Sequence, residues 1–268
     1  MEFSDVRAVA LAAARDAVAI HQRHLGRLRP EDWSLKGTAD FVSFVDREAE
    51  ACIIERIRSA FPAHAIMAEE SFSENDPDLD WRSAEWLWLV DPLDGTTNFL
   101  HGYPAYCASV AVTHRGAVVA GAVVCGPTGE EWCAVRHGGA TRNGAPIHVS
   151  GIDQLGSALV GTGFPFRYLE LLPRYLQQFD AVARCTAGVR RAGSAALDLC
   201  HVATGYFDGF WELNLNPWDI AAGSLVIHEA GGLITRMGQD LDLLRPGPVL
   251  AGNPVIHADL LALLRSVS

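Results

Sequence analysis

The segment Trp86-Leu87-Trp88-Leu89-Val90-Asp91-Pro92-Leu93-Asp94-Gly95-Thr96-Thr97-Asn98-Phe99 carries the strongest structural signal in this 268-residue sequence. Its first five residues are continuously apolar, which is typical of a strand covered on both faces. Asp91 and Asp94 then flank a proline, whose fixed φ makes the turn rigid. Gly95 permits an unusual backbone angle or a close ligand approach, and a helix beginning at Thr96 would offer free N–H groups to an anion. The segment predicts hard oxygen ligands beside a phosphate-sized site, with an ordinary Asx-type turn as the alternative.

Other candidate residues lie in three short segments, and each has a structural alternative. Glu69 follows a short apolar stretch and could be a solvated strand end. Asp219 follows Asn216, which fits as the N-cap of a helix, so its carboxylate could serve the helix dipole alone. Asp46 could cap an earlier helix. Glu212 lies seven residues before Asp219, at a predicted strand end.

The composition limits the classes of partner. The chain has 21 basic and 32 acidic residues, and its formal net charge of −11 disfavours bulk binding to nucleic acid or to an anionic membrane surface. Taken alone, this charge also disfavours a phosphorylated substrate. The hydrophobic fraction of 49% and the charged fraction of 20% are typical of a compact globular protein.

The sequence contains no apolar run of the roughly 18–20 residues that a membrane span needs. The N-terminal region mixes charged and apolar residues, unlike a signal peptide. We therefore expect a cytoplasmic protein. The six cysteines form no CxxC pair and show no zinc-ligand spacing, so we expect reduced thiols, mostly buried.

The pattern of elements predicts a meander followed by an alternation. A first helix is expected from a cap at Ser4 to about His24, and a second helix from about Asp46. Antiparallel strands follow over 105–114, 117–125 and 131–135. Strands and helices then alternate, including a helix beginning at Pro217. We expect two subdomains, an N-terminal one over 1–150 and a C-terminal one over 151–268, which share one interface.

Taken together, these segments resemble the inositol monophosphatase family, the lithium-sensitive, magnesium-dependent sugar phosphatases. The family pattern D-P-[ILV]-D-G-T-x-N-F matches Asp91–Phe99, and W-D-x-A-A-G matches Trp218–Gly223. The patterns E-A-G-G and G-E-E-S match Glu229–Gly232 and Ala68–Ser71, the latter with alanine in place of the first glycine. The stretch Gly193–Ala196 also matches, with Ser194 where many relatives carry threonine. The resemblance covers nearly the whole chain.

The resemblance implies a layered α/β fold, an αβαβα sandwich. Its layers would be paired N-terminal helices, a large antiparallel sheet, central helices, a smaller mixed sheet and outer helices. This order agrees with the predicted meander and alternation. Most of the metal ligands would come from the N-terminal subdomain, and the C-terminal subdomain would complete the site.

The resemblance also assigns metal ligands. Glu69, Asp91 and the backbone carbonyl of Leu93 would hold one Mg²⁺. Asp91 would also bind a second ion, which it would share with Asp94 and Asp219. A third, more weakly bound ion would be held by Glu69 and water. Magnesium prefers such oxygen ligands and needs no soft ones. Lithium inhibition is implied by the resemblance alone.

The remaining implied roles concern the substrate. The N–H groups of Gly95 and Thr96 would bind phosphate, and Asp46 would hydrogen-bond to the Thr96 hydroxyl. Glu212, Asp219 and Ala195 would face the sugar hydroxyls. Glu69, Thr96 and Asp46 would be the catalytic residues.

These assignments predict a phosphoric monoester hydrolase that acts on a small phosphorylated polyol. The expected reaction is that of an inositol-1-monophosphatase, which converts myo-inositol monophosphate to inositol and phosphate. A metal between Glu69 and Asp91 would activate the attacking water, with Thr96 as a hydrogen-bond relay, and a second metal would receive the leaving oxygen. No covalent phosphoenzyme is expected, because these motifs hold no nucleophilic Ser, Cys or His.

Alternatives remain open within the family and beyond it. A histidinol-phosphate, fructose-1,6-bisphosphate or 3′-phosphoadenosine phosphatase would use the same chemistry on another leaving group. A regulatory partner of the transcription machinery is an alternative of another class. The resemblance also implies a homodimer. The carboxylates of Glu69, Asp91, Asp94 and Asp219 reverse the objection from net charge, because about two to three Mg²⁺ ions beside them would attract a phosphate dianion.

Overall fold

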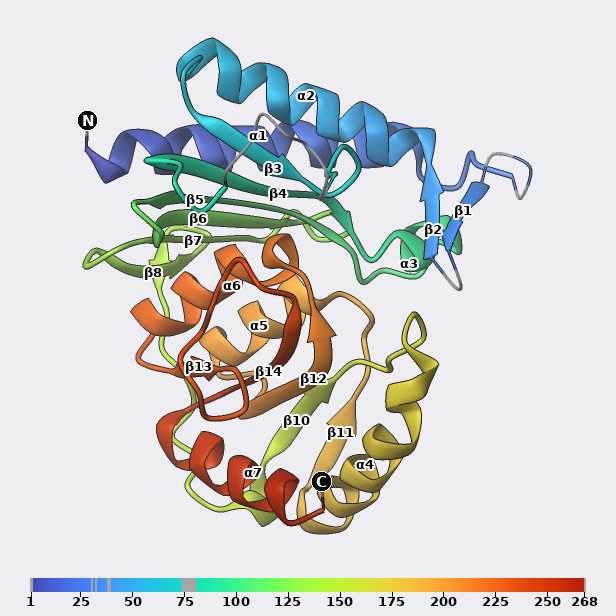
Figure 1. Ribbon diagram of the computed structural model, residues 1–268, viewed down its shortest axis with the longest axis vertical. Helices are drawn as coiled ribbons and strands as arrows, with labels where there is room; N and C mark the ends of the chain where they lie inside the picture. The colour runs from blue at the N-terminus through green and yellow to red at the C-terminus, as the bar shows by residue number, and fades with distance from the viewer. Residues whose placement is uncertain (1, 30, 32, 38–39, 74–80, 268) are drawn as a thin grey trace.

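The structure, a computed structural model, describes residues 2–29, 31, 33–37, 40–73 and 81–267, and it stacks helices and sheets in alternating layers (Figure 1). Helices α1 (Phe3–His24) and α2 (Phe44–Ala60) form the first layer. A large sheet, two central helices and a smaller sheet follow, and α4 (Leu172–Cys185) and α7 (Pro254–Ser266) cover the far side. The predicted layered α/β fold, with its αβαβα order, is confirmed.

The large sheet has seven strands and is antiparallel except at one edge. In spatial order the strands are β3 (Ala65–Ala68), β4 (Trp86–Asp94), β5 (Cys107–His114), β6 (Ala117–Cys125), β7 (Glu131–Val135), β8 (Gly139–Arg142) and β9 (Ala145–Pro146). The edge strand β3 runs parallel to β4, while the remaining neighbours are antiparallel. The prediction of an antiparallel sheet therefore needs one correction. The connection from β3 to β4 makes the parallel pair, and it brings the carboxyl ends of both strands to the same side.

Helix α1 packs on the large sheet through a stripe of small residues. Ala10, Ala13 and Ala17 have no exposed surface. The expected cap at Ser4 is wrong, because the N-cap is Glu2, two residues earlier. The N–H of Glu2 donates to Asp5 Oδ2 at 3.3 Å, as in a capping box.

Helix α2 follows a small two-stranded sheet formed by β1 (Trp33–Gly37) and β2 (Asp40–Ser43). Ser43 is the N-cap, and its hydroxyl accepts a hydrogen bond from the N–H of Val45. Asp46, expected at the start of the helix, lies in its first turn, and its Oδ2 accepts the N–H of Ser43 at 2.8 Å.

The smaller sheet has five strands and is mixed, as predicted. In spatial order the strands are β11 (Gly188–Arg190), β10 (Leu159–Thr162), β12 (Gly209–Leu215), β14 (Gly247–Gly252) and β13 (Leu233–Thr235). Strand β10 is parallel to β11 and β12, whereas β14 is antiparallel to β12 and β13. The short helices η2 (Leu155–Ser157) and η3 (Leu169–Leu171) flank β10.

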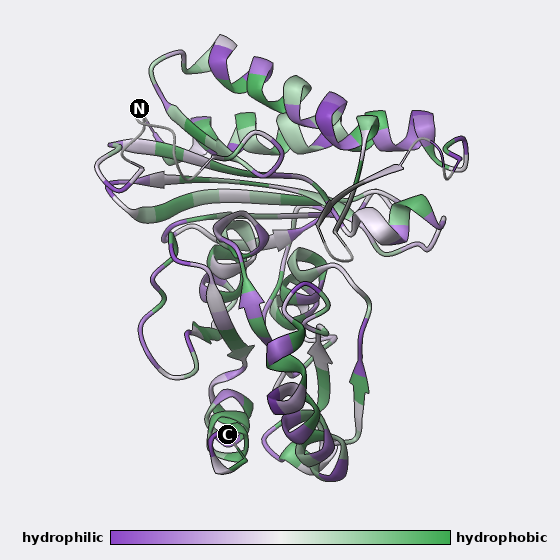
Figure 2. Ribbon diagram, turned by 45° about the vertical axis from the view of Figure 1, so that its right-hand side comes forward, coloured by the Kyte–Doolittle hydropathy of each residue, from purple (hydrophilic) through white to green (hydrophobic). Residues whose placement is uncertain are grey.

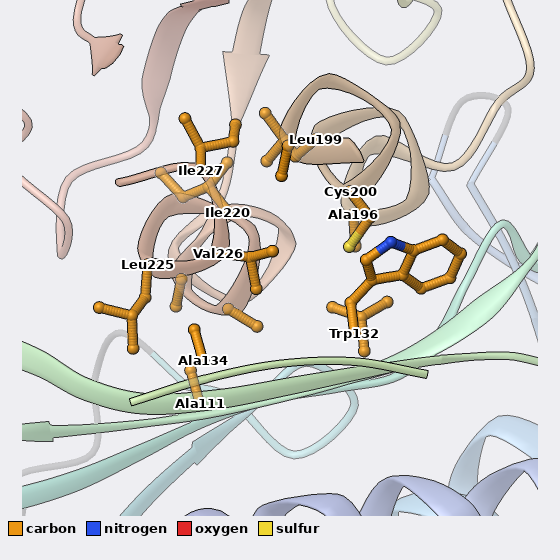
Figure 3. Packing of buried hydrophobic residues seen from close by; sticks show 14 of the residues in the cluster. Ala111, Trp132, Ala134, Ala196, Leu199, Cys200, Ile220, Leu225, Val226 and Ile227 are labelled. Carbon is orange, nitrogen blue, oxygen red and sulfur yellow. The ribbon is translucent and has the colours of Figure 1, made fainter. Parts of the chain in front are cut away.

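The central layer consists of α5 (Ala195–Thr204) and α6 (Pro217–Glu229), and it joins the two sheets. Figure 3 shows side chains of both helices against Ala111, Trp132 and Ala134 of the large sheet. The contact is close because β6 has a glycine there: a Cβ at Gly121 would lie 3.0 Å from the Cα of Ala222. Helix α6 therefore packs directly on the backbone of β6.

Residue 150 falls between the last strand of the large sheet and the first strand of the smaller one. One hydrophobic cluster includes residues of both sheets and of the central helices. The division into subdomains 1–150 and 151–268 stays a prediction.

Hydrophobic residues run along the strands, while hydrophilic ones lie on the outer turns of the helices (Figure 2).

Within the described residues, no helix is both long enough and apolar enough to span a membrane. All six cysteines are free, as expected. Four of them are buried, Cys52 is half-buried and Cys185 is exposed.

Candidate active site

A cavity of about 370 Å³ opens where the large sheet, the central helices and the loop after β10 meet. Nine of the ten predicted site residues line it, namely Glu69, Asp91, Leu93, Asp94, Gly95, Thr96, Ala195, Glu212 and Asp219. The tenth, Asp46, is buried at the start of α2 and touches the cavity wall through Thr96. The structure therefore brings together residues that lie as far as 173 positions apart in the chain, from Asp46 to Asp219.

Asp91 and Asp94 reach the same cavity because β4 is irregular at its end. Asp91 pairs with Ser109 and Asp94 with Cys107, so three steps along β4 match two steps along β5. In a regular strand, residues three apart point to opposite faces. The bulge at Pro92 and Leu93 removes this alternation, and the predicted rigid turn takes the form of a β-bulge.

The turn after β4 depends on Gly95. Its φ of +93° lies in the left-handed region, and a Cβ there would lie 2.8 Å from the carbonyl oxygen of Ala105. Any other residue would combine backbone strain with a steric clash. Helix α3 (Thr96–Leu100) begins directly afterwards, as predicted, and the Gly95 carbonyl accepts the N–H of Phe99.

Three carboxylates form a compact cluster in this cavity. Glu69, Asp91 and Asp219 each offer an oxygen, and these oxygens lie within 4.8 Å of one another. They come from three elements: the end of β3, the end of β4 and the first turn of α6. Asp94 lies outside this triplet but lines the same cavity.

Several of these carboxylates use one oxygen to fix the local backbone. Asp91 Oδ1 accepts the N–H of Leu93 at 3.0 Å, and Asp219 Oδ2 accepts the N–H of Asn216 at 2.7 Å. Asp219 therefore has the helix-start role given as its structural alternative and also belongs to the acidic triplet. The structural and the chemical interpretations are compatible, because a carboxylate has two oxygens.

Asp94 is held by the start of α5. Its Oδ2 accepts hydrogen bonds from the Ser194 hydroxyl and from the N–H of Ala196, both at 2.7 Å. The thiol of Cys107 lies 3.9 Å from the same oxygen. These donors fix the carboxylate on the wall that faces the triplet.

Asp46 combines its helix-start role with a contact to the site. Its Oδ2 accepts from the backbone and hydroxyl of Ser43, while its Oδ1 accepts the Thr96 hydroxyl at 2.9 Å. The same hydroxyl also lies 3.0 Å from the carbonyl oxygen of Leu93. One turn further along α2, Glu50 Oε2 accepts the N–H of Glu70 at 2.7 Å, next to Glu69.

The negative charges of the clustered carboxylates repel one another. Burial, followed by the charges of Glu69, Asp94 and Asp219, raises the pKa of Asp91 well above its ordinary value. The pKa of Asp219 is raised well above its ordinary value, first by burial and then by Glu69 and Asp94. Burial also raises the pKa of Asp94, against the hydrogen bond from Ser194. A site with this much uncompensated acid favours a multivalent cation.

The opposite half of the cavity is lined by β12, α5 and the loop after β10. Burial raises the pKa of Glu212 to about 8, although the positive charge of Arg191 acts in the other direction. The Arg191 guanidinium lies over the rings of Phe164 and Phe166, with its carbon 5.9 and 5.1 Å from their centroids. This half offers hydrogen-bonding groups and aromatic faces, as a sugar-like molecule requires.

Sequence reasoning missed two residues of the cavity wall. Ser194 was noted only as a departure from the family pattern, yet it holds Asp94. Asp198 was not singled out, yet it is buried in the wall. The available signal was a charged residue inside the apolar run Ala195-Ala196-Leu197-Asp198-Leu199-Cys200.

This arrangement can hold a hard divalent cation and an anion beside it. The donor set fits such an ion, because the clustered ligands are carboxylate oxygens from three separate elements. The residues described at the site include no Cys–His or Ser–His pair positioned for nucleophilic attack.

Comparisons with known proteins cover nearly the whole chain. A family model described as "Inositol monophosphatase family" matches residues 2–268. A Nus factor SuhB of Pseudomonas aeruginosa is 42% identical over 260 residues, which cover 96% of this chain and 94% of that protein. An inositol-1-monophosphatase of Mesorhizobium japonicum is 41% identical over 94% of this chain and 93% of its own length. The solved inositol monophosphatase of Anabaena superposes with a TM-score of 0.85 at 38% identity, covering 99% of this chain and 97% of that one.

Proposed function

The chain belongs to the inositol monophosphatase family, a family of metal-dependent phosphatases, and from this we propose that it hydrolyses the phosphate monoester of a small polyol with Mg²⁺. The substrate that we propose is myo-inositol monophosphate, with inositol and phosphate as products. The observation that carries the proposal is the triplet of Glu69, Asp91 and Asp219, whose oxygens lie within 4.8 Å in a cavity that also holds Glu212.

The proposed metal ligands are four side chains from three elements and one backbone carbonyl. Glu69, Asp91 and the Leu93 carbonyl would hold one Mg²⁺, while Asp91, Asp94 and Asp219 would hold a second, with a third, weaker ion at Glu69. The repulsion among the clustered carboxylates supports this assignment, because a bound divalent ion would reduce that repulsion. When bound, Mg²⁺ supplies Lewis-acid activation of water and neutralises negative charge on the departing oxygen.

The chain's own residues would orient the phosphate and move a proton. In our proposal, the N–H groups of Gly95 and Thr96 bind phosphate oxygens. The Thr96 hydroxyl accepts a hydrogen bond from the attacking water and donates a hydrogen bond to Asp46 Oδ1, which lies 2.9 Å away. Asp46 is buried and fixed by Ser43, so the hydroxyl is oriented before the substrate arrives.

The leaving group would lie in the second half of the cavity. There we propose that Glu212, Asp219 and the backbone N–H of Ala195 bind the hydroxyls of the polyol. Lithium inhibition follows from the same proposal, since Li⁺ would compete for a carboxylate site.

The test is a substrate panel on the purified protein with and without Mg²⁺ and LiCl. The panel contains myo-inositol 1-phosphate, histidinol phosphate, fructose 1,6-bisphosphate and 3′-phosphoadenosine 5′-phosphate. We expect Mg²⁺-dependent phosphate release, highest kcat/KM for the inositol ester and inhibition by LiCl. A higher kcat/KM for another ester would reassign the substrate while keeping the chemistry. Release of phosphate that is equal with Mg²⁺ and with a chelator would overturn the proposal.

A second candidate function is a role in transcription. It is favoured by one observation, namely that several relatives of about 40% identity carry the name Nus factor SuhB. We propose that this chain binds a component of the transcription machinery independently of catalysis. Glu69→Gln should abolish phosphate release but leave binding to purified RNA polymerase unchanged. Absence of binding by the wild-type protein would remove this candidate.

We also propose a homodimer in the cytoplasm. The six free cysteines support a reducing compartment, because thiols exposed to oxidising conditions pair or react. Light scattering of the purified protein tests the dimer: a mass near 58 kDa is expected, twice the chain mass of 28.9 kDa.

A further inference from the structure

Asp198 is a buried acid that the proposed reaction does not use. It lies in the first turn of α5, and its exposed fraction is 1%. Its neighbours in the helix are apolar. A carboxyl group in such a place lowers stability unless hydrogen bonds compensate for the lost water.

The compensation is incomplete. Among the described residues, Asp198 Oδ1 has no hydrogen-bond partner. Of the side chains that line the cavity, it is the one with a buried polar atom left in this state. Asp208 is a useful contrast: it is also buried, at 6% exposure, but its Oδ2 accepts the N–H of Leu159 at 2.7 Å.

The surroundings indicate what kind of group is missing. The negative charges of Glu212 and Asp94 act on Asp198, and they are opposed by the positive charge of Arg191. No ion pair between Asp198 and Arg191 occurs among the described residues. A further acceptor would add repulsion, so the missing partner is a hydrogen-bond donor, and the hydroxyl groups of a polyol are such donors.

We propose that Asp198 is a specificity-determining residue that accepts a hydrogen bond from a hydroxyl of the leaving group, either directly or through one water molecule bound with it. The substrate class is therefore a phosphate ester whose alcohol carries further hydroxyls. This inference rests on the proposed function and adds a second carboxyl beside Glu212 that recognises the polyol. The buried acid lowers stability in the free protein and gains its hydrogen bond when the polyol binds.

The experiment compares two substrates that differ in the leaving group. Myo-inositol 1-phosphate carries five further hydroxyls, whereas p-nitrophenyl phosphate carries none. For Asp198→Ala, kcat/KM for the inositol ester should fall roughly 10- to 100-fold, mainly through KM, because a buried hydrogen bond to the polyol is lost. The value for p-nitrophenyl phosphate should stay within about twofold. Asp198→Asn keeps an acceptor oxygen and should recover part of the loss.

Stability provides the second measurement. The melting temperature of Asp198→Asn should equal or exceed that of the wild type, because an incompletely bonded buried acid is removed. Asp208→Asn is the matched control: it should lower the melting temperature, since a buried hydrogen bond is weakened, and affect both substrates alike. Equal losses on both substrates for Asp198→Ala, or no loss on either, would overturn the role of Asp198 alone. Failure of the wild type to hydrolyse the inositol ester with Mg²⁺ would overturn this role together with the proposed function.

Discussion

The hydroxyl of Thr96 lies 2.9 Å from Asp46 Oδ1, although the two residues are 50 positions apart in the chain. This contact links the first turn of α2 to the first turn of α3 across the end of the large sheet. Asp46 uses its other oxygen to hold Ser43, so helix α2 and the cavity wall share one carboxylate.

Replacing Thr96 by valine keeps the shape of the side chain and removes the hydroxyl. We expect kcat to fall by at least roughly 10²-fold, because a positioned proton-transfer group contributes about that much or more. The melting temperature should change by only a few degrees. Steady-state kinetics with saturating Mg²⁺ measure the effect. Thr96→Ser restores the hydroxyl and should restore most of kcat, and a Val variant with wild-type kcat would contradict the relay.

Asp94→Asn tests whether the negative charge of Asp94 is needed to hold the second proposed Mg²⁺ ion. The amide can still accept from Ser194 and Ala196, so the local geometry should survive while the negative charge is lost. We expect a loss of at least roughly 10²-fold in kcat at saturating Mg²⁺. Ser194→Ala removes one of the donors and should cost about 10-fold in Mg²⁺ affinity, the usual scale for a residue that orients a ligand. Wild-type turnover by Asp94→Asn would argue against Asp94 as a ligand.

Mg²⁺ should stabilise the protein more at pH 8 than at pH 6. The pKa values of Asp91 and Asp219 are raised by burial and by neighbouring carboxylates, so the metal-free site retains protons that metal binding must release. At about 100 times the dissociation constant, the ion adds roughly 2.7 kcal/mol to the free energy of unfolding. Thermal melts with Mg²⁺ and with a chelator at both pH values provide the comparison. Asp91→Asn should lose most of the Mg²⁺-induced shift; a full shift in that variant would contradict the assignment.

Much of this architecture could be predicted because its signals are local. The asparagine–proline pair before Trp218 marks the start of α6, and the turn residues between 105 and 135 mark the strands of the meander. Helix α3 after Gly95 was also correct, and the αβαβα layering, which the family resemblance implied, is confirmed. Nine of the ten predicted site residues line one cavity, because the motifs that contain them lie at the ends of strands and the starts of helices.

The features that were missed depend on contacts between distant segments. The parallel pairing of β3 with β4 depends on the relative direction of two strands about 20 residues apart, which no periodicity encodes. Ser43 takes the cap that was expected at Asp46, because the helix begins two residues before it. The hydrogen bond from the Ser194 hydroxyl to Asp94 joins residues that are 100 positions apart, so a pattern within one segment could not reveal it.

Acid should weaken the fold through His21. Its Nε2 lies 2.9 Å from the carbonyl oxygen of Pro92, and burial lowers the pKa of this histidine to about 4 from an ordinary 6.5. The unfolded chain therefore binds a proton that the folded chain does not. The contribution of His21 to the free energy of unfolding is fully present above about pH 6.5. It decreases by roughly 3 kcal/mol in total as the pH falls towards 4.

Urea denaturation at pH 7 and at pH 5, with a chelator present, measures this loss. His21→Gln should be less stable than the wild type at pH 7 and should lose less between pH 7 and pH 5. His257, which is buried and lies 2.9 Å from the Thr235 hydroxyl through its Nε2, provides the comparison: its own substitution should leave the contact at Pro92 intact. Equal pH dependence in the wild type and in His21→Gln would contradict the assignment to His21.

The two halves of the cavity come from different layers of the molecule. Apart from Asp219, the acidic end belongs to the large sheet, while the end that we propose for the leaving group belongs to β12, α5 and the loop after β10. Gly121 lets α6 pack closely enough to hold these layers at a constant separation. Changes in the loop after β10 would leave the carboxylates of the large sheet in place, so under the proposed function this loop could alter during evolution while the proposed metal ligands stay fixed.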